Sequence, residues 1–332
     1  MNKYLAFGLL ALIFIFLLGN ANAYTNEGTY FACVNCSDCT DALNDNALYE
    51  VRLTASITNQ TGTCIDNPAN FINKTFDCQG FTIDGDDDGN DRGIYLEKKK
   101  GNTIKNCIIT DFYHGIFLYS SSNNNALTNN TVNTNVNGIY LFLISNNNTL
   151  TNNTVNNNTY YGITPDTSSN NNLINNTANN NARTGIYLNN ADNNNFTSNI
   201  VKFNQWHGLY AASGSTGNII NTNIFCSNNQ SGENYYDIYD GGSTTGDNNT
   251  FCSAHSYYDT GESSSHPMTY DECGGDCCFP VLAFVSPTPA NNTTTNKTNA
   301  EINISITEQN LDTFIFNWNG TNTTYNVSQL NG

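Results

Sequence analysis

Basic residues are scarce in this sequence. Its 332 residues include 11 lysines and arginines against 28 aspartates and glutamates, which gives a formal net charge of -17 at pH 7. A chain this acidic repels nucleic acids and anionic membranes, so neither is an expected partner. Cations and neutral or basic polymers remain compatible with it.

Long hydrophobic runs are also rare. The one near membrane-spanning length occupies residues 4–18, between Lys3 and the small-residue box Ala21-Asn22-Ala23. This layout predicts a secretory signal peptide over residues 1–23; the alternative is an uncleaved anchor, for which the run is short. We therefore expect an exported mature chain, secreted or on the cell surface, with no transmembrane segment.

Cysteine is absent from residues 108–225, although the chain has 11 cysteines in all. An oxidising compartment lets such cysteines pair, and their odd number leaves one thiol unpaired or bonded to another chain. The connectivity stays open. We expect disulfides at Cys33, Cys36 and Cys39, because the second C-x-x-C of a zinc site is missing.

Three apolar ladders share one period. A box such as "GIYL" recurs in steps of 22 to 24 residues, at Gly93, Gly115, Gly138, Gly162, Gly185 and Gly208. The same step links Ile104, Leu127, Leu150, Leu173, Phe196 and Ile220, and also Ile109, Val132, Val155, Ala178, Val201 and Phe225. Short alternating segments between Asn, Gly and Ser turns predict strands. Coils of about 23 residues, stacked roughly 4.8 Å apart, predict a parallel β-solenoid.

Asparagine saturates the repeat, as in "NNNTLTNNTVNNNTYYGI" at residues 146–163. This composition is typical of disorder, but the fixed period indicates a fold. Asparagine tolerates left-handed corners, and asparagines at equivalent positions can bond along a stack. We expect one such row, with Cys107 at its first rung, at Asn130, Asn153, Asn176, Asn199 and Asn223.

The run "FDCQGFTIDGDDDGNDRGIYLEKKKGNTIKNCIITDFYHGIFL" and the repeats after it resemble the right-handed parallel β-helix repeat proteins of the NosD-like and pectate-lyase-like class. The likeness is greatest to Asn-rich surface proteins of archaea and bacteria, and it covers about residues 64–251. It implies an all-β fold, a right-handed parallel β-helix. It does not imply one activity, because this fold hosts lyases, hydrolases, adhesins and metal-associated proteins.

We expect five segments: a signal peptide at 1–23, a Cys-rich N-terminal cap at 24–70, the β-helix at 71–252, a Cys-rich C-terminal cap or linker at 253–280, and a last segment at 281–332. Caps protect open solenoid ends from edge pairing. The last segment contains "AEINISI" and "TFIFNWNG", two alternating strands that resemble the start of an Ig-like β-sandwich. A full sandwich needs about 100 residues, so we expect a truncated module.

The densest charge cluster is "DGDDDGND" at residues 84–91. Its carboxylates suit calcium, with Asp84, Asp86, Asp88 and Asp91 as candidate ligands. Asp84, Asp86 and Asp88, with Arg92 beside them, are also the only candidates for a lyase or glycosidase site. We favour a solvated loop, because the EF-hand spacing and the Gly-His-Gly and Arg-Ile-Lys motifs of polygalacturonase-like enzymes are absent.

Soft metal donors occur in "HPMTYDECGGDCC", where His266 and Met268 precede three cysteines. They suit copper or zinc, which would fit a NosD-like copper accessory protein, but disulfides are favoured for the cysteines. His114 and His207 occupy the same coil position about four coils apart, roughly 19 Å, too far to share a metal. We expect both to be ordinary surface residues.

Strand alternation predicts a stripe of exposed aromatic side chains. If the isoleucines of the "GIYL" boxes point inward, the next residues point outward: Tyr95, Phe117, Tyr140, Thr164, Tyr187 and Tyr210. Such a row could stack on sugar rings while its hydroxyls bond at the ring edges. The alternative is that the aromatics only stabilise the strand face.

Asn-x-Ser/Thr sequons are dense, so the exported chain could be a glycoprotein. Candidate sites are Asn59, Asn73, Asn129, Asn152, Asn175, Asn195, Asn248, Asn292, Asn303 and Asn322.

The sequence therefore favours a non-catalytic, structural, adhesive or carbohydrate-binding protein whose partner is a polysaccharide or surface glycan. The alternatives are a polysaccharide lyase or glycoside hydrolase that uses residues 84–91, and a copper accessory protein. Calcium is the one cofactor with a candidate site.

Overall fold

The computed structural model describes residues 24–231 and 235–251, the backbones of six strands beyond them, and the side chain of Tyr258 in the first of those strands. The expected signal peptide, Cys252, Cys273, Cys277, Cys278, His266 and Asn292 lie outside the described residues, as does the side chain of Met268.

The N-terminal segment is built on a short helix. It contains β1 (Thr25–Asn26), β2 (Phe31–Cys33), α2 (Cys36–Asn44), β3 (Glu50–Leu53), β4 (Ile57–Gln60) and β5 (Ile65–Asp66). The Asn35 side chain caps α2 by accepting from the N–H of Asp38. At the other end, the buried Lys74 donates from Nζ to the carbonyls of Leu43 and Asp45, both at 2.7 Å. Lys74 thus ties the helix to the coil that follows.

Disulfides fasten this segment, as expected for the early cysteines. Cys33 pairs with Cys39, Cys36 with Cys64, and Cys78 with Cys107. Cys226 is also disulfide-bonded. The parallel stack already begins here, because β2 pairs with β3 and β3 with β6 inside the segment expected to be only a cap.

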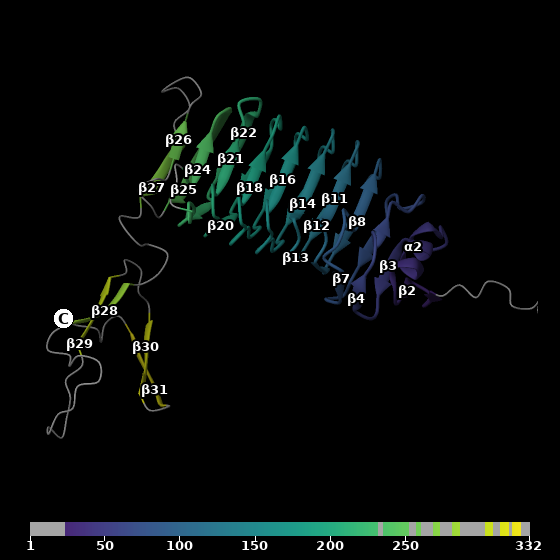
Figure 1. The fold of residues 1–332 in the computed structure, drawn as a ribbon, viewed down its shortest axis with the longest axis horizontal. Helices are drawn as coiled ribbons and strands as arrows, with labels where there is room; N and C mark the ends of the chain where they lie inside the picture. Colours follow the sequence, from purple (N-terminus) through teal and green to yellow (C-terminus); the bar gives the residue numbers. More distant parts are fainter. Residues whose placement is uncertain are drawn as a thin grey trace, which may run out of the picture.

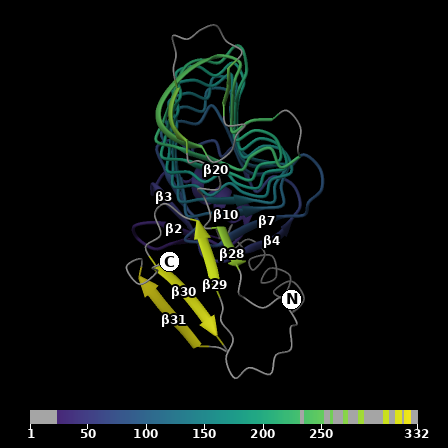
Figure 2. The same cartoon turned by 90° about the vertical axis from the view of Figure 1, so that its left-hand side faces the viewer.

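Successive coils contribute strands to three parallel sheets (Figures 1 and 2). The first sheet continues from β3 through β6 (Thr75–Asp77), β9 (Thr103–Lys105), β12 (Ala126–Thr128), β15 (Thr149–Thr151), β17 (Asn172–Ile174), β19 (Asn195–Thr197), β22 (Thr216–Asn221) and β25 (Ser243–Phe251), and β27 (Met268–Glu272) pairs with β25. The second contains β4, β7 (Thr82–Gly85), β10 (Ile108–Thr110) and β13 (Thr131–Asn133); β20 (Ile200–Lys202) and β23 (Ile224–Cys226) join β25.

The third sheet is the one that carries the "GIYL" boxes. It runs from β5 through β8 (Arg92–Glu97), β11 (His114–Tyr119), β14 (Asn137–Phe142), β16 (Ile163–Asp166), β18 (Ile186–Leu188), β21 (Leu209–Ala211), β24 (Ile238–Asp240) and β26 (Tyr257–Asp259). It contains nine strands, one from each coil. The predicted parallel β-helix is therefore confirmed.

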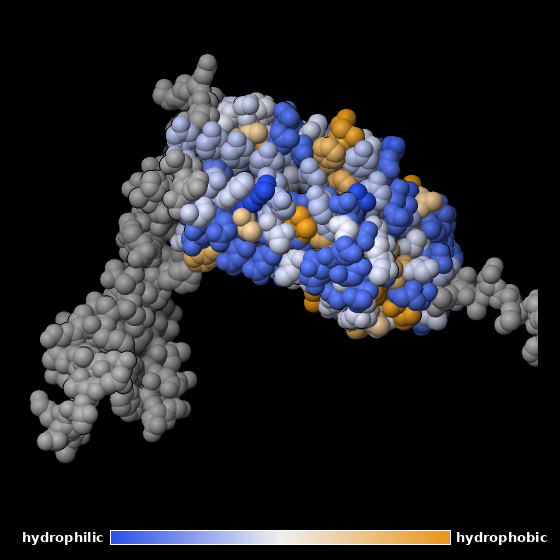
Figure 3. Space-filling view, viewed as in Figure 1, coloured by the Kyte–Doolittle hydropathy of each residue, from blue (hydrophilic) through white to orange (hydrophobic). Residues whose placement is uncertain are grey.

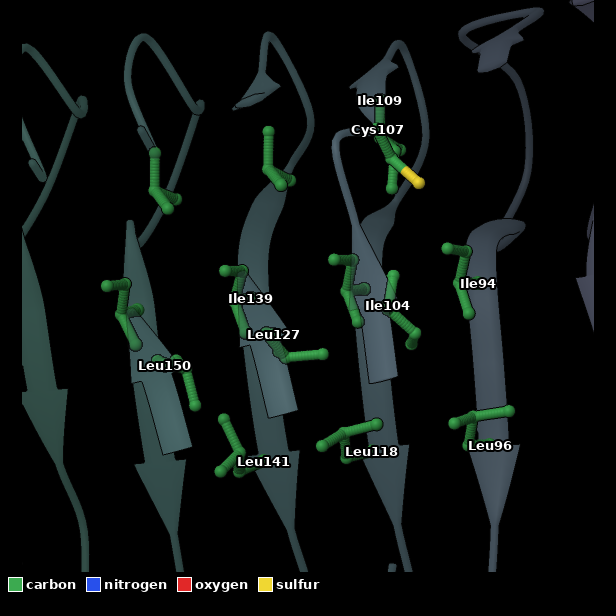
Figure 4. Close-up of a cluster of buried hydrophobic side chains, with 14 of the residues drawn as sticks. Ile94, Leu96, Ile104, Cys107, Ile109, Leu118, Leu127, Ile139, Leu141 and Leu150 are labelled. Carbon is green, nitrogen blue, oxygen red and sulfur yellow. The ribbon is translucent and has the colours of Figure 1, made fainter. Parts of the chain in front are cut away.

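The core consists of the predicted apolar ladders. Ile104, Leu127 and Leu150 are in register in the first sheet and fully buried, and their rows are visible in Figure 4. The glycine of each box is required by this packing: a Cβ on Gly138 would lie 2.2 Å from Cγ1 of Val155 in the next coil. On the face shown in Figure 3, the coloured part of the surface is mainly hydrophilic, with small separate hydrophobic patches.

Asparagine has two distinct roles at the corners. The first asparagine of a pair, such as Asn129 or Asn152, is exposed and has a left-handed backbone with φ of 55° or 56°. The second, such as Asn130 or Asn153, is buried, and its Oδ1 accepts from the backbone N–H of the equivalent residue one coil earlier. The predicted row is confirmed from Cys107 to Asn223, and it continues to Asn249.

Two further asparagine ladders run beside the predicted one. Their members are Asn102, Asn125, Asn148, Asn171, Asn194 and Asn218 in one, and Asn135, Asn158, Asn181, Asn204 and Asn228 in the other. Buried amides that bond both backbone and side chain of the neighbouring coil fix the stacking register.

The C-terminal strands pair antiparallel. β28 (Val281–Val285) pairs with β29 (Asn303–Thr307), and β30 (Thr313–Trp318) with β31 (Thr321–Asn326). The two strands expected from "AEINISI" and "TFIFNWNG" are present, while the Ig-like module stays a prediction. No helix in the described part of the chain is long and apolar enough to cross a membrane.

Candidate binding face

The outward positions of the third sheet form one aromatic column. In register along the strands lie Tyr95, Phe117, Tyr140 and Thr164, and then Tyr187, Tyr210, Tyr239 and Tyr258. We call this row the aromatic column. The predicted stripe is thus brought together, and Tyr239 and Tyr258 extend it. The sequence pattern did not mark these two because Asp237 and Ser256 stand where the box has glycine, and because the steps of 29 and then 19 residues depart from the period of about 23.

The rings of the aromatic column stack on one another. Ring centroids lie 5.4 Å apart for Phe117 and Tyr140 and 4.7 Å apart for Tyr210 and Tyr239, with interplanar angles of 16° and 7°. The expected exposure is wrong in part, since Phe117 is only 6% exposed. Because neighbouring rings cover each other's faces, most of the column presents ring edges and hydroxyls.

The column is interrupted at Thr164. This side chain is 2% exposed, and its buried Oγ1 has no hydrogen-bond partner. Tyr161 leans into the break and stacks on Tyr187 at 4.7 Å with an angle of 9°. The rings therefore form two stacks, one ending at Tyr140 and the other beginning at Tyr161. No ring contact joins the two among the residues described here.

A second, shorter aromatic row flanks the first stack. Tyr119 and Phe142 lie two residues beyond the column on β11 and β14, and their centroids are 5.8 Å apart. Phe142 also stacks on Tyr140 at 5.6 Å. The same alternation that predicts the column would have found this row. We call the aromatic column with Tyr119, Phe142 and Tyr161 the aromatic face.

Two tyrosine hydroxyls on this face donate to carboxylates. Tyr140 donates to Oδ2 of Asp166 at 2.7 Å, and Tyr95 to Oε2 of Glu97 at 3.2 Å. Burial and then the Asp166 carboxylate raise the pKa of Tyr140, and burial with Glu97 raises the pKa of Tyr95 to about 12. Asp166 also accepts from Nδ2 of Asn189 at 3.0 Å. These phenols stay protonated donors throughout the physiological range.

His114 and His207 are buried beside the column, so the expectation of surface histidines is wrong. Each is 6% exposed; His114 stacks on Phe117 at 4.7 Å. Burial lowers the pKa of His114 to about 3 and that of His207 to about 4. Nδ1 of His207 accepts from the N–H of Tyr236 at 3.0 Å, whereas Nδ1 of His114 is buried without a partner. Both imidazoles are neutral at physiological pH.

Two arginines lie against rings of this face. The guanidinium of Arg92 is 4.9 Å from the Tyr95 centroid and 5.2 Å from that of Phe117. The guanidinium of Arg183 is 6.0 Å from the Tyr161 centroid, and it lies between two rings beside the face, Tyr160 at 3.8 Å and Trp206 at 4.7 Å. Arg92 had been expected to work with the acidic loop, and the structure associates it with the rings. Nothing in the spacing of the boxes marked Arg183.

The acidic loop does not form a compact site. Asp84 accepts from the Asn59 N–H at 3.1 Å and from the Thr110 hydroxyl at 2.8 Å. Burial opposes ionisation of Asp84, but these bonds outweigh it and lower its pKa. Burial and the neighbouring Asp84 raise the pKa of Asp111, a partner that sequence inspection missed.

The remaining candidate ligands of the loop accept hydrogen bonds from different backbone N–H groups. Asp86 accepts from the N–H of Asp88 at 3.2 Å, and Asp91 accepts from the N–H of Gly62 at 2.9 Å. Within the described residues, no three His, Cys, Asp or Glu side chains gather as a metal site.

The sequons follow from the corner geometry. Asn129, Asn152, Asn175 and Asn248 are each an exposed left-handed asparagine followed by a buried ladder asparagine and then a threonine that pairs with a neighbouring coil. Asn59 and Asn73 are also exposed and left-handed, and Asn195 lies in β19. Asn303 and Asn322 lie in β29 and β31. The fold itself thus accounts for much of the sequon density, and glycosylation stays a prediction.

Coils held by stacked asparagines, with one sheet covered by stacked rings, define a parallel β-helix of the pectate-lyase-like type. A family model described as "Periplasmic copper-binding protein (NosD)" matches residues 44–248, more than half of the chain. The chain therefore belongs to the NosD family. No curated protein sequence matches it.

Several solved structures are similar to part of this chain. The periplasmic alginate epimerase AlgG is 17% identical with a TM-score of 0.45, over 67% of this chain and 57% of its own. The A-module of the mannuronan C-5 epimerase AlgE6 from Azotobacter vinelandii is 15% identical (TM-score 0.44; 68% and 72% covered). An alginate lyase from Paenibacillus sp. str. FPU-7 is 16% identical (TM-score 0.44; 67% and 76% covered). The chain thus spans little more than half the length of AlgG.

Proposed function

We propose that this protein is an exported carbohydrate-binding protein, structural or adhesive in role, and that its aromatic face contacts the glycan. The observation that carries the proposal is the aromatic column itself, which continues from β8 to β26 outside the hydrophobic core. Rings that do not fill the core need another reason to be repeated in coil after coil.

The geometry suggests how the face contacts sugars. Hydroxyl-bearing ring edges recur along the column at the strand spacing of about 4.8 Å, except at Phe117 and Thr164, so an extended glycan along the axis meets phenols in most coils. Stacking covers the ring faces inside each stack, whereas the ring of Tyr258, at the end of the second stack, is 42% exposed. Sugar rings would stack there, and their hydroxyls would bond to the phenols elsewhere.

Disulfides support the exported location, because they persist in oxidising compartments. A calcium-dependent lyase or glycosidase at residues 84–91 has less support. A glycosidase needs two carboxyls that face one substrate, whereas Asp84 is held by the Asn59 N–H and the Thr110 hydroxyl, and Asp86 and Asp91 bond to separate backbone N–H groups. For copper binding, the donors His266 and Met268 lie outside the side chains described.

The test is affinity electrophoresis of the mature chain in gels that contain soluble polysaccharides, with and without calcium. Tyr187→Phe with Tyr210→Phe removes two hydroxyls and keeps the stack. We expect about tenfold weaker retention, since each hydrogen bond contributes about 0.5–1.5 kcal/mol. Tyr49→Ala, at a tyrosine 68% exposed and outside the face, is the matched control.

Failure to retain any polysaccharide, or unchanged retention of the double variant, would overturn the proposal. Analysis of the same incubations for released sugars addresses the enzyme alternative. If sugars are released only with calcium, and are no longer released by the Asp86→Asn, Asp88→Asn double variant, the enzyme alternative would replace the binding proposal.

A further inference from the structure

We propose that the ligand of the aromatic face is an acidic polysaccharide, whose carboxylate or sulfate groups bind Arg92 and Arg183. This inference rests on the proposed carbohydrate-binding function and narrows its ligand. It replaces the neutral glycan that the overall charge suggested.

The three arginines of the chain differ in one respect. Arg52 lies 4.0 Å over the ring of Tyr30, and its Nε is also paired with Glu50 at 2.8 Å. Arg92 and Arg183 lie on rings in the same way, yet neither guanidinium has a hydrogen bond or ion pair with any described residue. The two arginines without an anion are the two on the binding face.

Arg183 is held in an orientation suited to an anion. Its guanidinium lies between Tyr160 and Trp206, and Trp206 stacks on Tyr235 at 5.3 Å. Stacking occupies both faces of the planar cation and leaves its N–H groups at the edge. Edge N–H groups are those that bind carboxylates and sulfates in paired hydrogen bonds.

Arg92 has a buried hydrogen-bond donor without a partner. Its Nε is buried and has no hydrogen-bond acceptor, although a buried donor without a partner costs about 1–3 kcal/mol. Nδ1 of His114, which stacks on the same Phe117, is also buried without a partner. A bound anionic sugar would contact the terminal N–H groups of Arg92, which make no hydrogen bond with a described residue, and its charge would stabilise the cation whose Nε lies unpartnered behind them.

The carboxylates of the face, by contrast, are already partnered. Glu97 accepts from Lys98 at 3.0 Å and from the Tyr95 hydroxyl. Asp166 accepts from Tyr140 and Asn189. Among the charged groups of this face that the structure describes, the two arginines are therefore the ones without a hydrogen-bonding partner, even though the chain has a net charge of -17.

The two cations also fit a polymer better than a small anion. Arg92 belongs to the β8 coil and Arg183 to the β18 coil, four strand spacings or about 19 Å apart along the axis. The aromatic column runs between them. One extended chain can contact both arginines and the phenols.

The experiment compares polymers that share a backbone but differ in charge: dextran, carboxymethyl-dextran and dextran sulfate, and polygalacturonate with its methyl ester. Retention of the mature chain is measured for each in affinity gels at 0.15 M salt. A protein this acidic repels polyanions at long range, so retention of a polyanion reports a specific site. We expect each charged polymer to retain the protein more strongly than its neutral counterpart. The comparison of carboxymethyl-dextran with dextran sulfate shows whether carboxylate or sulfate is preferred.

Arg92→Gln and Arg183→Gln should each weaken retention of the charged polymer about tenfold, the effect of one charge-assisted hydrogen bond. The Arg183→Lys variant should keep part of the retention of the charged polymer, because lysine keeps the charge but lacks the planar guanidinium. Arg52→Gln is the matched control and should change nothing.

Equal retention of charged and neutral polymers, or a charge preference that survives in the Arg92→Gln, Arg183→Gln double variant, would overturn this inference. If neutral polymers are still retained through the tyrosines, carbohydrate binding stands and only the acidic ligand is rejected. If no polymer is retained, both proposals are rejected.

Discussion

Replacing Asn153 with alanine tests whether the asparagine ladder holds the coils together. Its Nδ2 donates to the Leu127 carbonyl and to Oδ1 of Asn176, both at 2.9 Å. Its Oδ1 accepts from the N–H and Nδ2 of Asn130, at 3.1 and 2.9 Å. Alanine removes the partner of the Leu127 carbonyl and of the Asn130 N–H, at about 1–3 kcal/mol each. We expect a loss of about 4 kcal/mol in the free energy of unfolding.

The assay is urea unfolding followed by far-UV circular dichroism, with Asn152→Ala as the control. Asn152 is exposed and left-handed, and its side chain makes no hydrogen bond with a described residue. Alanine there costs only the strain of a positive φ, about 1 kcal/mol. If the two adjacent variants lost the same stability, the reasoning that separates ladder from corner asparagines would be refuted.

Two further predictions concern the core and the histidines. Gly138→Ala places a Cβ 2.2 Å from Cγ1 of Val155, so thermal melts should show a loss of about 2–3 kcal/mol in the free energy of unfolding. A melting temperature equal to that of the wild type would contradict this packing argument. The pKa of His207 is lowered by burial from 6.5 to about 4, so the unfolded chain binds this proton more readily between those values. Stability should therefore fall as the pH drops from 6.5 towards 4, and His207→Phe should flatten this slope in urea midpoints measured across the pH range.

The stacking of the coils could be predicted because the repeat period is visible in the amino-acid sequence. Ile104 and Leu127, like Asn130 and Asn153, are separated by one coil, and residues at one coil spacing must be neighbours in a solenoid. The two additional asparagine ladders obey the same period. They were missed because asparagine is so common that only the row beside the hydrophobic residues stood out.

Contacts across a coil corner could not be predicted in this way. The burial of His114, the direction of Arg92 towards Tyr95, and the pairing of Asp84 with Asp111 depend on side-chain rotamers and loop paths. Strand alternation says that Phe117 points outward. It does not say that its neighbours cover both faces of the ring.

The asparagine ladders also have a direction. In each rung the backbone N–H of one asparagine donates to the Oδ1 of the asparagine in the next coil, so these hydrogen bonds all run in one direction along the axis. At the C-terminal end of one ladder the last donors, the N–H and Nδ2 of Asn228, meet the carboxylate of Asp237 at 3.2 and 2.7 Å. A negatively charged acceptor thus ends this row of donors. The asparagine ladder has a donor end and an acceptor end, as a helix has, and its donor end carries an acidic cap as a helix N-terminus often does.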